Sequence, residues 1–438
     1  MSVETLKAPI GAMPPVSRLR VSQRAKLLAL AFLVLVLTSL ASPGGGFIIT
    51  PVFFFLRNRL HLSTEGIATF NLLAGAPLYV SFLFGLVRDR WSPFGWGDKG
   101  HYIVFGVAAA AAFGVIAFLP LSSGALLAAM IILTALVLVP LSAANALFSE
   151  LGQSHAMTGQ SGTVLAAATF VPPTIAYLLG GVLSGALEGR NALLAARALF
   201  GLGAAIMAAV VLFGLLAPRE LTRGPTAPRR RIGAEVAALF RTRSAWPPIL
   251  IMFLWDFAPA FGVVMQMHMA TDLHASDAQV GAFYAIFNGA NIPAIILYGW
   301  LAPRVRLKTL LTWAAVVGVP SMLPLLLARS AQGEIWAALV VGLMSGFSIA
   351  AFCHLAVVSC PRALEGTMMS LAMVTAFFVA QRFGDVFGAW LYQRNGGFVT
   401  TEIVTTLVYA LVVPVLFLVP RQILQSEDGE ADPRATAP

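Results

Sequence analysis

Long apolar stretches, separated by short charged connections, run along almost the whole of this 438-residue chain. A helix needs about 20 apolar residues to cross the hydrocarbon core of a bilayer. The pattern predicts twelve such segments, at residues 27–56, 66–87, 101–120, 125–148, 161–187, 192–217, 248–270, 279–302, 307–328, 334–358, 366–392 and 399–419. The sequence therefore predicts an all-α integral membrane protein with twelve transmembrane helices.

The longest polar connection, residues 218–247, divides these segments into two sets of six. The expected organisation is an N-terminal segment, two six-helix halves joined by a basic cytoplasmic linker, and a disordered tail, at residues 1–26, 27–217, 218–247, 248–420 and 421–438. Pro43 and the three glycines after it predict a break in the first helix. A signal peptide is the alternative for this start, but the apolar run resumes at Phe47.

Composition and charge support the membrane assignment and set the orientation. Hydrophobic residues make up 58% of the chain and charged residues 11%, too few to cover a water-soluble particle of this size. With both ends inside, 21 Lys and Arg residues fall in cytoplasmic segments and five outside. This asymmetry predicts an N-in, C-in orientation and explains the net charge of +9 without nucleic acid. Cys353 and Cys360 are expected to be reduced packing residues.

The two halves share a short internal repeat. Leu60-His61-Leu62-Ser63 matches Leu273-His274-Ala275-Ser276 at an offset of 213 residues, and Ser42-Pro43 is echoed by Ala258-Pro259. Each match runs between corresponding segments, so the halves are expected to share one orientation. Six spans, a basic linker and a parallel repeat resemble the major facilitator superfamily, which implies a substrate site near the membrane midplane between the halves.

A second resemblance is local. Residues 85–90, with Gly85, Asp89 and Arg90, are similar to the superfamily's G-x-x-x-D-R motif between helices 2 and 3. Residues 89–95 (DRWSPFG), the segment FLWDFAPAFG and the later LYGWL resemble the folate–biopterin transporter family and its bacterial relatives. The resemblance implies that Asp89 acts as a cytoplasmic gate against the start of helix 11, where Arg362 adds positive charge.

A few polar residues lie deep in the predicted spans, where charges are costly and usually functional. Asp256 lies in helix 7 beside Trp255, and no basic residue lies within a turn of it. An isolated carboxyl group in an apolar medium favours its neutral, protonated form, which suits it to carry a proton. Arg382 can take a carboxylate by bidentate hydrogen bonds, and Trp255 can stack on a planar ring.

The remaining candidates lie on helices 7, 8 and 11, which border the central cavity of the fold that this sequence resembles. Gln381, Asn288 and Asn291 are expected to bind substrate with Arg382 and Trp255, whereas Asp385 and His268 join Asp256 as candidates for proton coupling. Each has a structural alternative: Arg382 and Asp385 as a buried ion pair, the asparagines as interhelical hydrogen-bonding groups, and His268 as an interfacial residue.

Enzyme signatures for zinc hydrolases, serine hydrolases and ATP-binding loops are absent from the sequence, and no cofactor or metal is expected. The resulting hypothesis is a monomeric secondary transporter in the cell membrane, the inner membrane if the source is bacterial. It moves a pterin- or folate-like or other small organic anion by alternating access, together with protons. Two alternatives stay open, namely a drug- or sugar-type facilitator of the same fold, and a non-transporting membrane factor like the bacteriochlorophyll-antenna assembly proteins.

Overall fold

The computed structural model of the protein describes residues 20–44, 46–119, 122–154, 158–188, 192–218, 221, 246–302, 304–359, 378–394, 396–420 and 424. Most of the predicted linker 218–247, the predicted tail 421–438 and the start of the predicted eleventh span lie outside these residues. Secondary structure within the described ranges is almost entirely helical, as the apolar pattern predicted.

The N-terminal half contains one short 3₁₀ helix, η1, and nine α-helices. They are α1 (Val21–Ala41), α2 (Gly46–Asn58), α3 (Thr64–Ala74), α4 (Ala76–Tyr79), α5 (Ser81–Arg90), η1 (Pro93–Gly95), α6 (Asp98–Ile116), α7 (Ser123–Ser154), α8 (Thr158–Glu188) and α9 (Ala192–Leu216). The predicted first span is two helices, α1 and α2, separated at Pro43. The break expected from the proline and glycines is thus confirmed.

The C-terminal half follows the same plan. Its helices are α11 (Trp246–Asp256), α12 (Val263–Met267), the π-helical turn η4 (His268–Asp272), α13 (Asp277–Leu301), α14 (Leu307–Gly318), η5 (Leu323–Leu327), α15 (Ala331–Val358), α17 (Gln381–Arg394), α18 (Gly397–Ala410) and α19 (Val412–Leu416). The predicted seventh span is interrupted at residues 257–262, a break that the sequence pattern did not predict.

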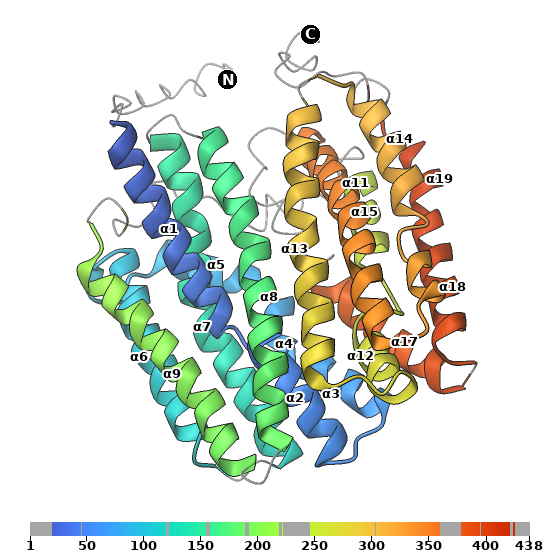
Figure 1. The fold of residues 1–438 in the computed structure, drawn as a ribbon. Coiled ribbons are helices and arrows are strands. Elements are labelled where there is room, and N and C mark those ends of the chain that lie inside the picture. The colour runs from blue at the N-terminus through green and yellow to red at the C-terminus, as the bar shows by residue number, and fades with distance from the viewer. Residues whose placement is uncertain are drawn as a thin grey trace, which may run out of the picture.

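The two halves stand side by side as bundles of steep helices (Figure 1). The start of α1 and the end of α19 lie at the same end of the molecule, here called the proximal end, and the opposite end is called the distal end. Nine helices in the described ranges are long and apolar enough to span a membrane. The predicted spans 66–87, 248–270 and 366–392 are broken or incompletely described, so the count of twelve stays a prediction.

The repeat seen in the sequence is a repeat of backbone geometry at the distal end. His61 and His274 both adopt the left-handed conformation, with φ of 51° and 50°. Leu60 and Leu273 each donate to the carbonyl five residues earlier, and Leu62 and Ala275 each donate to the carbonyl six residues earlier. Ser63 and Ser276 then cap the following helices by accepting a hydrogen bond from Gly66 and Gln279. The 213-residue offset is therefore structural.

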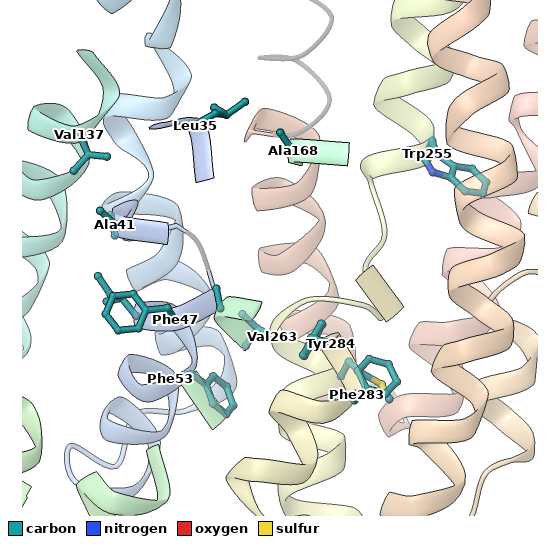
Figure 2. Close-up of a cluster of buried hydrophobic side chains, with 14 of the residues drawn as sticks. Leu35, Ala41, Phe47, Phe53, Val137, Ala168, Trp255, Val263, Phe283 and Tyr284 are labelled. Atoms are coloured by element: carbon teal, nitrogen blue, oxygen red, sulfur yellow. The ribbon is translucent and has the colours of Figure 1, made fainter. Parts of the chain in front are cut away.

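Buried apolar side chains continue from one half into the other (Figure 2). Phe47 and Phe53 of α2 are 1% and 2% exposed, and they lie near Val263 and Phe283 of the C-terminal half. In a membrane, lipid is as apolar as these side chains, so close packing rather than escape from water holds such helices together. The broken helices α2 and α12 are thereby fixed at the contact between the halves.

Candidate functional site

The break in the seventh span, residues 257–262, is a stretch of irregular backbone between α11 and α12. Breaking a helix leaves backbone groups without partners, which in a membrane must be satisfied by other parts of the protein. Three side chains do this from three helices. The hydroxyl of Tyr284 donates to the carbonyls of Phe261 and Gly262 at 2.7 and 2.9 Å, Thr405 Oγ1 accepts from the Ala260 amide at 3.0 Å, and Asp385 Oδ1 accepts from the Val263 amide at 3.2 Å.

Two glycines of α17 allow this helix to approach the break closely. A Cβ on Gly388 would lie 1.9 Å from the carbonyl oxygen of Pro259, and one on Gly384 would lie 3.2 Å from the amide nitrogen of Ala258. Any larger residue at Gly388 would push α17 away from the break. The glycine spacing therefore fixes the depth at which the neighbouring charged residues of α17 lie.

Arg382 and Asp385 form an ion pair, with 3.3 Å between Arg382 Nη1 and Asp385 Oδ2. Their side chains are 12% and 3% exposed. The guanidinium and carboxylate act electrostatically on the hydroxyls of Tyr79 and Tyr177, which belong to the N-terminal half. Tyr177 in turn stacks on Tyr284 of α13 at 4.8 Å between ring centroids. A charged pair and aromatic rings from both halves thus meet beside the broken helix, and we call these five residues the central cluster.

The described polar contacts between the halves are concentrated at the distal end. Arg57 Nη2 donates to the Ala270 carbonyl at 3.3 Å, and Ser184 donates a hydrogen bond to Asp277. Residues 57 and 270 are also 213 apart, so a residue and its repeat counterpart touch, which places them close to the pseudo-two-fold axis. The helices α8 and α13 cross here at Gly181 and Gly281, where an added Cβ on Gly281 would lie 2.8 Å from Gly181 Cα.

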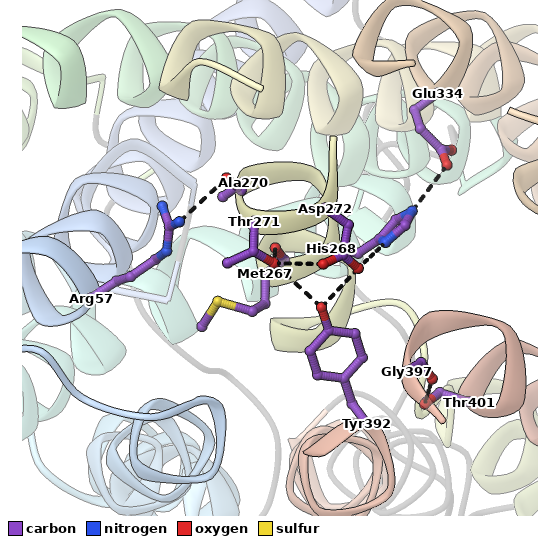
Figure 3. A network of polar contacts seen from close by, with 10 residues as sticks. All are labelled: Arg57, Met267, His268, Ala270, Thr271, Asp272, Glu334, Tyr392, Gly397 and Thr401. Atoms are coloured by element: carbon purple, nitrogen blue, oxygen red, sulfur yellow. Dashed lines mark hydrogen bonds and ion pairs between the residues drawn. The ribbon is translucent and has the colours of Figure 1, made fainter. Parts of the chain in front are cut away.

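A second polar cluster fills the distal end of the C-terminal half (Figure 3). His268 Nδ1 lies 2.7 Å from Asp272 Oδ2, and the hydroxyl of Tyr392 donates to the same oxygen at 2.9 Å. Partial burial raises the pKa of Asp272, but hydrogen bonds from His268, Tyr392 and Thr271 outweigh it, so the net pKa lies below its ordinary value. On the other side of the imidazole ring, Nε2 lies 3.7 Å from Glu334 Oε1.

Two residues of this distal cluster escaped the sequence analysis. Glu334 lies in the first turn of α15 and Glu402 in the second turn of α18, so both sit near the ends of predicted spans, where acidic residues are common. Both side chains are 0% exposed, and neither carboxyl group forms a hydrogen bond with a described residue. Sequence position suggests a water-facing helix end, whereas the packing of neighbouring helices buries both groups.

The structure brings some predicted site residues together and separates others. Arg382 and Asp385 are paired in the central cluster, with the exposed Gln381 beside them in sequence. Trp255 is 5% exposed and stacks on Tyr409 at 4.4 Å between ring centroids, inside the C-terminal half.

Asn288 and Asn291 donate to carbonyls of their own helix, those of Tyr284 and Phe287. Asp256 ends α11 at the break, and no described residue forms a hydrogen bond or ion pair with its carboxylate.

The predicted gate lies largely outside the described side chains. Gly85 packs near Ser142, whereas the side chains of Asp89 and Arg90, and Arg362 altogether, lie outside the description. The neighbouring Arg88, which sequence analysis did not select, forms two hydrogen bonds with Asp98, at 2.9 and 2.6 Å. His101 lies 3.5 Å from the same carboxylate. The loop after α5 is therefore closed by a buried ion pair.

Two apolar bundles related by an internal repeat, with broken helices and a polar cluster where they meet, define a multi-pass membrane transporter fold. Comparison with known families agrees with this class. The Major Facilitator Superfamily profile matches residues 163–384, just over half of the chain. The chain therefore belongs to the Major Facilitator Superfamily. A search of curated proteins finds no match.

Solved structures of low sequence identity share the fold over nearly the whole chain. One is a bacterial homologue of the human lysosomal transporter Spinster, in an inward-facing and unoccupied conformation. It is 16% identical in sequence, with a TM-score of 0.68, and the match covers 94% of this chain and 100% of that one. The nucleoside transporter NupG gives 15% identity and a TM-score of 0.67, over 91% of this chain and 100% of that one. A POT family transporter in complex with 5-aminolevulinic acid gives 14% identity and a TM-score of 0.70, over 91% of this chain and 96% of that one.

Proposed function

We propose that this protein is a proton-coupled secondary transporter of a small organic anion, with Arg382 as the group that binds the anion. The observation that carries the proposal is the central cluster. A guanidinium held between the two halves, 12% exposed and electrostatically linked to tyrosines of the opposite half, is suited to bind a carboxylate. The stacked rings of Tyr177 and Tyr284 beside it are suited to a planar, aromatic substrate such as a pterin or a folate.

The ion pair suggests how protons and anion are coupled. Asp385 is anchored through Oδ1 to the Val263 amide, and its Oδ2 neutralises Arg382. A proton bound at Oδ2 would remove the negative charge and free the guanidinium to accept the carboxylate of a substrate. Proton and anion would then bind together and move in the same direction. Asp256, at the end of α11 on the other side of the break, is a second proton carrier in this proposal.

The closed distal end gives the proposal a conformational state. With both chain ends inside the cell, as the distribution of Lys and Arg predicts, the distal end faces outside. The contacts of Arg57 with Ala270, Ser184 with Asp277 and Gly181 with Gly281 then close the external gate. Alternating access requires that these contacts open while Asp89, Arg90 and Arg362 close the cytoplasmic side. The bacterial inner membrane is the expected location if the source is prokaryotic.

Uptake by proteoliposomes tests the function. Pterins, folates, other organic anions and sugars are presented with and without an inward proton gradient. We expect gradient-driven uptake of an aromatic anion, and Asp256→Asn is expected to abolish accumulation while sparing exchange. Sugar uptake that ignores the proton gradient would instead favour the facilitator alternative. Absence of any uptake together with a stable pigment-protein complex would favour the assembly factor.

Arg382→Lys tests the site. It keeps the charge but loses the planar guanidinium, so anion binding should weaken by about 1.5–3 kcal/mol, or tenfold to over a hundredfold. The matched control is Arg197→Lys, whose exposed arginine lies over the Phe118 ring, 5.1 Å from its centroid, and away from the central cluster. The double variant Arg382→Gln/Asp385→Asn separates structure from binding. A folded double variant that still gains the wild-type thermal stabilisation from the substrate would contradict the role of Arg382.

A further inference from the structure

We propose that His268, Glu334 and Glu402 form a proton-binding site at the distal end of the C-terminal half, which exchanges protons with the distal surface through Asp272. This site is separate from the central cluster and from Asp256. It comprises residues of three elements, η4, α15 and α18, that the fold brings together from positions far apart in the sequence. The ligand of this site is the proton itself. It is bound by buried carboxyl groups whose negative charge no arginine or lysine among the described residues neutralises.

The position of His268 Nε2 opposite a buried carboxyl oxygen, 3.7 Å away and beyond hydrogen-bond distance, favours a proton on His268 or on Glu334. Nδ1 of His268 lies 2.7 Å from the partly exposed Asp272 carboxylate and therefore carries a hydrogen that it donates. In the neutral imidazole, Nε2 would then present a lone pair to Glu334 Oε1 at 3.7 Å. Two facing lone pairs repel each other, so one of the two atoms binds a proton. Either the ring is an imidazolium beside a carboxylate, or a neutral ring faces a protonated Glu334.

Glu402 extends the site inward. Its carboxyl oxygens are buried without a hydrogen bond, and it lies close enough to Glu334 for the two charges to act on each other. Thr401 and Thr405 donate to carbonyls of their own helix, those of Gly397 and Thr401, and the buried hydroxyl of Thr406, one turn after Glu402, forms no hydrogen bond with a described residue. Burying an isolated ionised carboxylate costs far more than binding a proton, so Glu402 is held neutral. Two buried carboxylates next to each other cannot both be ionised.

Asp272 connects the site to the distal surface, and no described arginine or lysine is paired with Glu334 or Glu402. Asp272 is 45% exposed and accepts hydrogen bonds from Tyr392 of α17 as well as from His268. Arg57 of α2 is directed to the Ala270 carbonyl and acts electrostatically on Tyr392 and Asp277 (Figure 3). Arg329, just before α15, is exposed, and Tyr409 of α18 faces both Glu402 and Asp256.

These contacts define a route for the proton. Starting from the imidazolium, the ring releases its Nε2 proton to Glu334 Oε1 and keeps the hydrogen on Nδ1. A tautomeric shift then moves that hydrogen from Nδ1 to Nε2, and a proton that Asp272 has bound from the distal solution passes to the vacated Nδ1, which restores the imidazolium. Glu402, whose charge acts on Glu334, competes for the same proton. The stacked ring of Phe398, 4.0 Å from the His268 ring, keeps the imidazole in the orientation that both carboxylates need.

Infrared difference spectroscopy on the purified full-length protein tests the site without any substrate. A protonated carboxyl group in an apolar site gives a carbonyl band that shifts in deuterated water. We expect this band in the wild-type protein at neutral pH, and we expect Glu402→Gln and Glu334→Gln each to reduce it. Glu65→Gln is the matched control, because that side chain is 38% exposed at the same end of the molecule. Asp256→Asn identifies any contribution from α11.

Access through His268 is tested by the rate of the deuterium shift. His268→Asn should slow the shift at least severalfold, whereas His274→Asn, at an exposed histidine in the repeat turn, should leave it unchanged. Absence of the band, or a band in both glutamine variants as strong as in the wild-type protein, would overturn the proton site. An equally fast shift in His268→Asn would overturn the route. A protein that shows the band but transports none of the tested solutes would keep this site and reject the proposed function.

Discussion

The two halves of this protein share backbone geometry but differ in how they treat buried charge. At the distal end, the turn around His61 and the turn around His274 have φ values within 1° of each other, the same backbone hydrogen bonds and a serine cap, to which Gln279 adds a capping box in the C-terminal half. In the N-terminal half, the described buried charges Arg88 and Asp98 neutralise each other. In the C-terminal half, Arg382 and Asp385 are paired as well, but Glu334 and Glu402 are buried without an arginine or lysine partner among the described residues.

The difference shows which features the fold requires and which it only tolerates. A tight turn between consecutive helices has few low-energy solutions, so both copies of the repeat keep the same one. The placement of buried charge is less constrained, because one ion pair or protonated carboxyl group can be exchanged for another without changing the path of the backbone. One half can therefore use a buried ion pair to close a loop, while the other holds carboxyl groups that bind protons.

The largest expected effect is at the buried ion pair. Asp98→Asn removes the carboxylate that accepts two hydrogen bonds from the buried Arg88 guanidinium, and losing one member of a buried ion pair typically costs about 3–5 kcal/mol of unfolding free energy. Glu402→Gln, which replaces a neutral carboxyl group by a neutral amide, should cost far less at neutral pH. Unfolding in detergent by heat or denaturant measures both, with Glu65→Gln as the exposed control. If both variants lost the same unfolding free energy, the buried charges of the two halves would not differ in their contribution to stability.

The next effect is at the contact between the halves. A Cβ on Gly281 would lie 2.5 Å from the Tyr177 carbonyl oxygen, so Gly281→Val should destabilise the closed distal end by about 1–3 kcal/mol. Gly299→Val on the same helix is the control, because nothing lies within 4 Å of its added Cβ. Labelling of a cysteine introduced at Thr174 by an impermeant reagent from the distal side should increase in Gly281→Val alone. Equal labelling in both variants would contradict the gate.

A smaller effect is expected at the two serine caps. Ser63→Ala and Ser276→Ala each remove the hydrogen bond to the first turn of a helix, which should cost about 1 kcal/mol in each half. Thermal unfolding of the two variants and of the double variant measures the costs, which should add because the sites are in different turns. A loss of stability in only one of the two single variants would mean that the two turns share their backbone geometry but that only one serine cap stabilises the protein.

The smallest effect is the pH dependence at Asp272. Because its folded-state pKa is lowered, the stabilisation is fully present above the unfolded-state pKa of about 3.9 and is lost as pH falls through the folded value. The side chain is 45% exposed, so the effect should stay below about 1 kcal/mol. Asp272→Asn should flatten the acid limb of the stability profile. A steeper loss of stability on acidification in this variant would contradict the assignment.

Sequence reasoning located part of the candidate site. The i,i+3 spacing of Arg382 and Asp385 predicted that the two could pair, because residues three apart share a helix face. The break in the seventh span was missed, because FAPAF is apolar throughout and a hydrophobicity pattern does not distinguish a helix from a turn. Glu334 and Glu402 were missed because they are the first and the fourth residue of the predicted spans 334–358 and 399–419, where an acidic side chain is normally expected to reach water.

By itself the sequence determined the membrane class, the positions of most helices, the break at Pro43 and the repeat, because these depend on local composition and on spacing along the chain. Tertiary structure alone decided which polar groups meet. The five residues of the central cluster come from four helices of two halves, and the distal proton site comes from three elements spread over more than a hundred residues. Such contacts depend on how glycines such as Gly281 and Gly388 let helices approach, a three-dimensional property that no pattern along the chain contains.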